Sequence, residues 1–176
     1  LPKSVYATSK LACEHLLSTY AQVKGINWNA LRMFNVYGPG QDITKGDQGV
    51  VGIFMNMLLK QDVVQVKGSL ARFRDLIHVD DVIQGWDLCL HSDIYNESYN
   101  LGSGIKTTYK DLIISLAKVM GKETTLKLEE LPGTAGDMMG CYADITKIKT
   151  QLQFSPKYDV ESGINDMYDW VIKENK

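Results

Sequence analysis

The sequence lacks the features that mark several large classes of protein. Its 176 residues hold only three cysteines, an odd number without CxxC spacing, so neither a disulfide framework nor a cysteine metal centre is expected. We interpret Cys13, Cys89 and Cys141 as reduced thiols of a cytoplasmic protein. The three histidines stand beside no cluster of further ligands, so no metal site is predicted.

Long apolar runs and an excess of basic residues are also missing. No run reaches the roughly 18 residues that a membrane-spanning helix needs. Lys and Arg number 19 against 21 Asp and Glu, and a net charge of -2 offers no basic surplus for nucleic acid or an anionic membrane. The chain begins at Leu1 without a signal-peptide pattern, and we therefore expect a fragment of a longer protein.

What is present suffices for a folded core, because 44% of the residues are hydrophobic. Apolar positions at helical spacing predict a helix over 6–24 that ends at Gly25. Further helices are expected at 50–60, from Asp80 or Asp81 to Leu90, from Thr107 or Thr108 to Met120, at 144–152 and at 159–173. Strands are expected at 27–34, 63–67, 74–79, 97–101 and 125–129. This alternation predicts an α/β fold.

A tyrosine and a lysine four residues apart begin the first helix, in the sequence YATSK. Residues i and i+4 share a helix face, so the Tyr6 hydroxyl and the Lys10 ammonium can point into one cleft. A neighbouring cation favours the phenolate and draws the pKa of a tyrosine towards the range of a general base. The alternative is a half-exposed tyrosine and a solvated lysine near a helix start.

The stretch LRMFNVYGPG places a polar residue where an apolar strand ends. Asn35 stands at the carboxyl end of that strand, the position at which open α/β sheets bind ligands. The alternative is an ordinary strand exit, in which Asn35 merely tolerates the turn.

The stretch GSLARFRDLIHVDDV carries two arginines. Arg72 and Arg74 stand two apart on extended chain and so face the same way, which suits a grip on a diphosphate, although Arg72 can equally be a solvated turn residue. We interpret His78 as a hydrogen-bonded core residue and the acids Asp80 and Asp81 as helix caps.

Residues 46–52 match GxxGxxG, yet they do not predict a dinucleotide-binding loop. Such a loop follows a hydrophobic strand directly, whereas residues 41–45 are polar.

Together, YATSKLACE, RMFNVYGPGQ and RFRDLIHVDDV resemble, in this order, the NAD-dependent epimerase/dehydratase family of extended short-chain dehydrogenases. GDMMGCYADITKIKTQL at 136–152 is a weaker fourth match. The similarity is greatest to UDP-glucose and UDP-N-acetylglucosamine 4-epimerases and covers essentially the whole chain. It implies the C-terminal part of a Rossmann-type fold. Residues 1–35 would end the Rossmann domain, and 36–176 would mainly form the nucleotide-sugar-binding domain, with some segments returning to the Rossmann sheet.

The resemblance implies an NAD cofactor and catalytic roles for two residues. Tyr6 would take the proton from the sugar 4-hydroxyl while the C4 hydride passes to NAD, and Lys10 would hold the nicotinamide ribose and lower the pKa of Tyr6. In an epimerase the 4-keto sugar then turns over and receives the hydride on its other face. Phe34 matches a position whose backbone lies near the nicotinamide.

The resemblance also implies a nucleotide-diphosphate sugar as substrate. Positions that match substrate contacts are Asn35 and Arg74 on the diphosphate, Gly49 and Val50 on the nucleotide, Val66 near uracil, Asp137 on the ribose and Cys141 in the hexose pocket. A small residue at the Cys141 position admits an N-acetyl group, so N-acetylhexosamine substrates are compatible with this chain. One phosphate contact is in doubt, because Thr134 stands where the family usually has arginine.

The largest departure from the family is an absence. Its glycine loop, ribose-binding acid and catalytic Ser/Thr all lie upstream of Tyr6, in about 140 residues, the length of a nucleotide-binding half. We therefore expect a fragment that is inactive alone. In the parent fold the helix at 6–23 also contributes to a dimer interface, so a homodimer through this helix, or an unstable isolated piece, is expected.

Two other interpretations stay open. The parent enzyme can be a 4,6-dehydratase of a nucleotide-diphosphate sugar, whose distinguishing acid pair lies upstream of this chain. The chain can also be a non-catalytic nucleotide-sugar binding or dimerisation module, which would bind UDP-sugars without any requirement for NAD.

Overall fold

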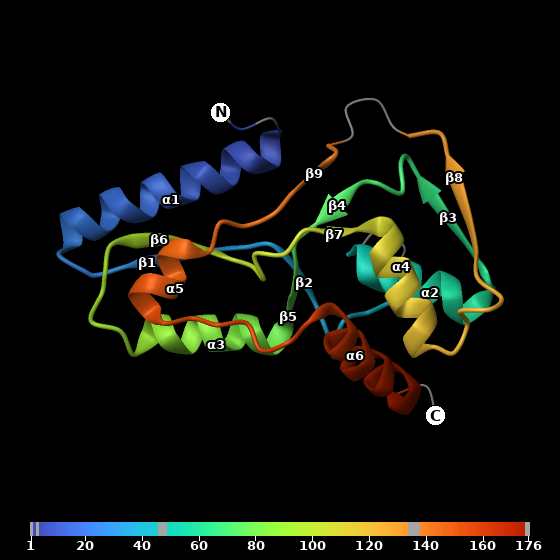
Figure 1. Ribbon diagram of the computed structural model, residues 1–176. Coiled ribbons are helices and arrows are strands. Elements are labelled where there is room, and N and C mark those ends of the chain that lie inside the picture. Colours follow the sequence, from blue (N-terminus) through green and yellow to red (C-terminus); the bar gives the residue numbers. More distant parts are fainter. Residues whose placement is uncertain (1, 3, 46–48, 134–137, 175–176) are drawn as a thin grey trace.

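The computed structural model describes residues 2, 4–45, 49–133 and 138–174 (Figure 1). Its helices are α1 (Val5–Lys24), α2 (Val50–Lys60), α3 (Val79–Leu90), α4 (Tyr109–Val119), α5 (Thr146–Leu152) and α6 (Val160–Glu174). Its strands are β1 (Asn29–Met33), β2 (Asn35–Tyr37), β3 (Val63–Lys67), β4 (Phe73–Arg74), β5 (Leu76–His78), β6 (Glu97–Leu101), β7 (Thr107–Thr108), β8 (Lys127–Leu131) and β9 (Gly140–Cys141). Among these residues, no helix is both long and apolar enough to cross a membrane.

The strands pair into short ladders, most of them parallel. Parallel pairs are formed by β1 with β6, β2 with β5, and β3 with β8. A three-stranded sheet places β4 between β7, which is antiparallel to it, and β9, which is parallel. Parallel neighbours require crossover connections, which here contain helices, as the predicted α/β class demands.

Two lobes surround separate hydrophobic cores (Figure 1). The first lobe comprises β1, β6, α3 and α5, and its core includes Ile77, Tyr99, Leu101, Ile148 and Phe154. The second lobe comprises α2, β3, β8, α4 and α6. Its core includes Met55, Leu58, Val64, Leu116 and Met167. The division of the chain at residue 35 into two domains stays a prediction.

The β2–β5 ladder lies between the lobes and contributes to both cores. Side chains alternate along a strand, so neighbouring residues face opposite sides. Val36 and Ile77 accordingly pack in the first core, whereas Tyr37 and Leu76 pack in the second.

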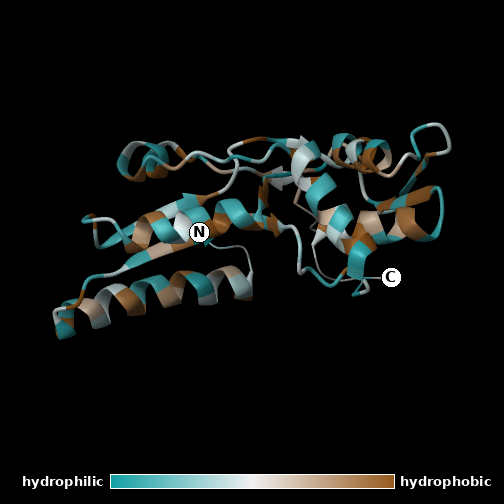
Figure 2. Cartoon of the chain, turned by 90° about the horizontal axis from the view of Figure 1, so that it is seen from below, coloured by the Kyte–Doolittle hydropathy of each residue, from teal (hydrophilic) through white to brown (hydrophobic). Residues whose placement is uncertain are grey.

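Helix α1 is almost uncovered. It begins at the N-cap Ser4, whose hydroxyl accepts from the Ala7 N–H, and it ends at Gly25 in the left-handed conformation. Ala21 is its one buried residue, although hydrophobic residues are spread along the helix at the outer edge of the first lobe (Figure 2). A bidentate ion pair from Glu14 to Arg32 of β1, at 2.8 and 2.6 Å, ties it to the sheet.

Several predicted element boundaries need correction. Residues 74–79 are not one strand, because Asp75 separates β4 from β5 and α3 begins at Val79. The N-cap of α3 is His78, whose ring accepts from the Asp80 N–H, so the assignment of Asp80 or Asp81 as cap was wrong. The Thr108 cap of α4 is confirmed.

Candidate functional site

A cavity of about 520 Å³ lies where α2, β3 and β4 meet. Five residues that the family resemblance implies as substrate contacts line it together: Asn35, Gly49, Val50, Val66 and Arg74. The other lining residues are Ile53, Phe54, Met57, Gln65, Lys67, Arg72, Tyr109 and Leu131.

The walls combine apolar surface with positive charge. Apolar side chains come from α2 and from β3, where Val66 is 1% exposed. Lys67, Arg72 and Arg74 are the charged residues among those described around the cavity, and all three are cationic. Such a cavity suits a ligand that joins a flat, partly apolar group to an anionic group.

Arg72 directly precedes β4 and Arg74 ends it, and both side chains line the cavity, as their spacing predicts. Nη1 of Arg72 donates to the Lys67 carbonyl at 3.0 Å, and Nη1 of Arg74 donates to the Phe73 carbonyl at 2.7 Å. Both guanidinium groups lie over the Tyr109 ring, at 5.2 and 5.3 Å from its centroid. Arg72 lines the cavity and is also a turn residue, because its backbone N–H donates to the Ser69 carbonyl at 3.1 Å.

Asp75, which the sequence analysis did not single out, holds this region in place. Its carboxylate is fully buried and accepts four hydrogen bonds, from Ser103 N and Oγ (both 2.7 Å), Gly104 N (2.9 Å) and Ala143 N (3.0 Å). Its backbone carbonyl accepts from the backbone and side-chain amides of Asn35, at 3.1 and 3.0 Å. The sequence did contain a signal for Asp75, because it is an acid between Arg74 and an apolar strand. An unpaired carboxylate is costly to bury, so hydrogen-bond partners for it could have been expected.

Phe34 and Cys141 are not among the described residues that line this cavity. Phe34 joins β1 to β2 and donates its backbone N–H to the Leu101 carbonyl at 3.0 Å. Cys141 is exposed on β9 and is the register partner of Arg74. Asp137, like Thr134, lies outside the described residues.

Tyr6 and Lys10 share a helix face, as their spacing predicts. The Lys10 Nζ lies 5.9 Å from the centroid of the Tyr6 ring. Both residues line a hollow of about 490 Å³ that also includes Glu14 and β1, and Tyr6 is 72% exposed. Their hollow is distinct from the cavity of Asn35 and Arg74.

The GxxGxxG match has only partly described surroundings, because residues 46–48 lie outside the description. Gly49 precedes α2 with φ +64°, but β2 ends at Tyr37 and the described residues 38–45 contain no strand. The strand that a dinucleotide loop requires directly before it is thus missing from the described part of this segment.

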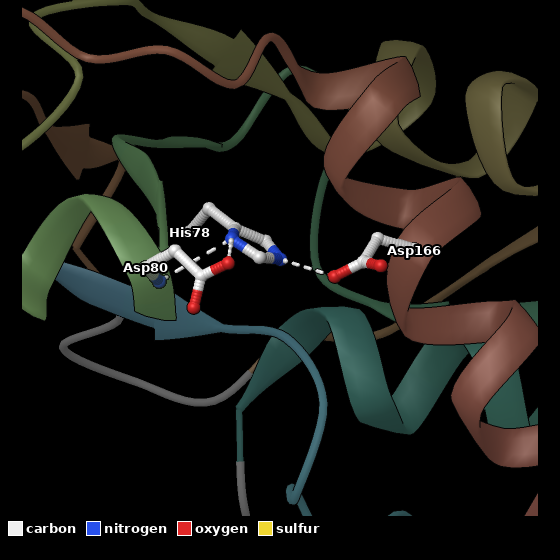
Figure 3. Close-up of side chains that lie close together, drawn as sticks. All are labelled: His78, Asp80 and Asp166. Atoms are coloured by element: carbon white, nitrogen blue, oxygen red, sulfur yellow. Dashed lines mark hydrogen bonds and ion pairs between the residues drawn. The ribbon is translucent and has the colours of Figure 1, made fainter.

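His78 lies between two carboxylates where the lobes meet (Figure 3). Its Nδ1 accepts from the Asp80 N–H at 3.3 Å, its Nε2 lies 3.4 Å from Asp166 Oδ2, and its ring stacks on Tyr158. Within the described ranges, this is the one group of three side chains close enough together to share a metal ion. Because the two ring nitrogens face different protein groups, we interpret His78 as a buried link between α3 and α6. Its interpretation as a core residue is confirmed.

Comparisons with known proteins identify relatives over nearly the whole chain. The family profile described as GDP-mannose 4,6 dehydratase matches residues 1–167. A putative UDP-glucose 4-epimerase from Methanocaldococcus jannaschii is 30% identical over 175 residues, which are 99% of this chain and 55% of that protein. The chain spans about half the length of the curated relatives it matches.

Solved structures show the same likeness. The crystal structure of UDP-glucose 4-epimerase with UDP-glucose from Thermotoga maritima has a TM-score of 0.92 at 32% identity, over 100% of this chain and 56% of that one. UDP-glucuronic acid 4-epimerase from Bacillus cereus, in complex with UDP-glucuronic acid and NAD, has a TM-score of 0.86 at 29% identity, over 99% and 54%. The α/β fold class expected from the sequence is therefore confirmed.

Proposed function

This chain belongs to the GDP-mannose 4,6 dehydratase family, and we propose that it forms the nucleotide-sugar-binding part of an NAD-dependent 4-epimerase. The observation that carries the proposal is the cavity in which Asn35, Gly49, Val50, Val66 and Arg74 lie together. The resemblance of the sequence to the epimerase/dehydratase family implies substrate contacts for the same five residues. The structures of the relatives named above hold UDP-sugars.

In this proposal the cavity takes the nucleoside diphosphate. Arg74 and Asn35 contact the diphosphate, since a guanidinium offers paired donors to phosphate oxygens. Gly49 and Val50 meet the nucleotide, and Val66 packs near the base. Asp137 binds the ribose, and Cys141, beside Arg74 in the ladder, lines the hexose pocket.

The chemistry is assigned to the hollow at the start of α1. The Tyr6 hydroxyl and the Lys10 ammonium fit the ribose and nicotinamide side of NAD, because they are a proton-transferring group and a cation on one helix face. Phe34 contributes backbone near the nicotinamide. NAD, when bound, accepts and returns a hydride. Tyr6 removes and returns the proton of the sugar hydroxyl, and Lys10 stabilises the phenolate.

The rest of the NAD site is proposed to lie upstream of Tyr6, so this chain alone is expected to lack turnover. We also propose a homodimer through α1, whose apolar side chains are exposed. A reducing compartment such as the cytoplasm suits the three free cysteines.

A second candidate is a 4,6-dehydratase, which the description of the matching family profile favours. It uses the same nucleotide cavity and differs in the acids beside the upstream Ser/Thr. Product analysis of the full-length protein distinguishes a 4-epimer from a 4-keto-6-deoxy sugar.

Titration calorimetry with UDP-glucose tests the binding function. We expect the full-length protein with NAD present to bind UDP-glucose, and Arg74→Ala should weaken this binding about 10- to 100-fold through loss of a charge-assisted hydrogen bond. Lys118→Ala is the matched control, because it removes a cation of α4 that pairs with Glu161 away from the cavity. A full-length protein that binds no nucleotide sugar, or an Arg74→Ala variant that binds normally, contradicts the proposal.

A further inference from the structure

Tyr109 places an aromatic ring beneath both arginines of the cavity. It is the first residue of α4 and is 8% exposed, and its ring packs at 80° to the ring of Phe54, with 5.4 Å between centroids. Its backbone N–H also donates to the Arg72 carbonyl at 2.7 Å. Contacts with the second core and with the backbone of Arg72 therefore hold the ring in place.

A contact that orders the long side chain of an arginine before a ligand arrives favours binding of an anion by its guanidinium group. The Nη1 atom of Arg74 donates to the neighbouring Phe73 carbonyl, and no ion pair holds Arg74 among the residues the structure describes. Arginine has several rotatable bonds, so binding an anion normally orders the side chain at a cost to affinity. A ring face attracts the guanidinium and fixes its plane without neutralising its charge.

We propose that Tyr109 is a positioning residue of this site, which holds Arg72 and Arg74 over its ring so that both guanidinium groups meet the diphosphate of a nucleoside diphosphate. This inference rests on the proposed function of the cavity. The phenol hydroxyl has no part in it, because the contact is made by the ring face. Each such contact corresponds to about 2- to 5-fold in an equilibrium constant, so two contacts correspond to about tenfold.

The test uses the full-length protein, with UDP as the probe in titration calorimetry. Tyr109→Phe keeps the ring and should bind UDP within twofold of the parent. Tyr109→Leu and Tyr109→Met keep an apolar side chain without a ring, and each should weaken UDP binding about tenfold. Two ringless variants are used because Tyr109 packs in the core and one of them can fail to fold.

A second measurement separates positioning from a merely structural role. In the ligand-free protein, ¹⁵N relaxation of the arginine Nε–H groups should show Arg72 and Arg74 becoming more mobile in the ringless variants and unchanged in Tyr109→Phe. Unaltered UDP affinity in a folded ringless variant overturns the inference, as does weaker binding with unaltered arginine mobility. If the parent protein binds no UDP, the proposed function fails and the inference fails with it.

Discussion

At the scale of single residues, the buried carboxylate of Asp75 decides the geometry of the site. Its carboxylate oxygens accept hydrogen bonds from the backbone N–H groups of Ser103, Gly104 and Ala143. It thereby connects its own segment to two others that are distant in sequence. Its neighbour Arg74 and its hydrogen-bonded partner Asn35 both line the cavity. Four hydrogen bonds from N–H and O–H donors to these carboxylate oxygens offset the cost of burying the carboxyl group.

We expect Asp75→Asn to lower the free energy of unfolding by about 2–4 kcal/mol. In the parent, backbone N–H groups donate to both carboxylate oxygens. In the variant the NH₂ group replaces one of these oxygens, so the N–H groups that faced it lose their acceptor. Urea unfolding measures the change. Asp93→Asn is the control, because Asp93 is exposed and its replacement should change stability by less than about 0.5 kcal/mol. Equal stability of the two variants would contradict the role given to Asp75.

At the scale of elements, the sequence predicts those features that are determined by residues close together in the chain. The Tyr6–Lys10 pair follows from helix periodicity alone, and the stop at Gly25 follows from one left-handed residue. The start of α3 does not follow in this way. Asp81 resembles a cap in sequence, but its carboxylate accepts from the backbone of Lys157 and Tyr158, and His78 caps the helix instead.

The cavity shows the same limit. The family resemblance selected five of its residues, but it selected neither the rest of the apolar wall from α2 nor the ring of Tyr109. They reach the cavity only because the second lobe packs its helices on β3. The local sequence does not predict that Tyr109 contacts the arginines, because any apolar residue at the start of α4 could pack in the core.

The attachment of α1 gives a pH-dependent prediction. The hydrogen bond from Arg32 is the largest cause that lowers the pKa of Glu14 below its ordinary value. A carboxyl with a lowered folded-state pKa stabilises the fold above its unfolded pKa, and this contribution is lost as the pH falls through the folded value. Because the pair is partly exposed, Glu14→Gln should cost less than about 1 kcal/mol at pH 7.

Urea unfolding of the parent and of Glu14→Gln at pH 7 and pH 3.5 measures this contribution. The difference between the two proteins should shrink as the pH falls, because protonation of Glu14 removes the negative charge that pairs with Arg32. A difference that is independent of pH would rule out the ion pair as its source.

At the scale of the whole molecule, α1 lies on the first lobe and exposes apolar surface that the second lobe does not cover. Val5, Leu16, Tyr20 and Val23 are exposed apolar side chains on one helix. Burying such a face against a second copy or against an upstream segment is favourable, at roughly 25 cal/mol per Å² of apolar area.

We therefore expect the chain to self-associate, and size-exclusion chromatography with light scattering should detect a species larger than a monomer. The double variant Leu16→Lys and Val23→Lys should shift it towards the monomer. Leu90→Lys is the matched control, because Leu90 is equally exposed, at 76%, but lies on α3. A well-behaved monomer of the parent chain would count against an interface on α1.

The order of strand partners along the chain has a consequence for any attempt to separate the lobes. The first-lobe pair β1–β6 and the second-lobe pair β3–β8 interleave, since β3 precedes β6 and β6 precedes β8. Every single break between Met33 and Lys127 divides at least one ladder between two polypeptides. Neither lobe is thus a contiguous stretch of gene, and truncation, domain shuffling or limited proteolysis cannot deliver one lobe intact without the other.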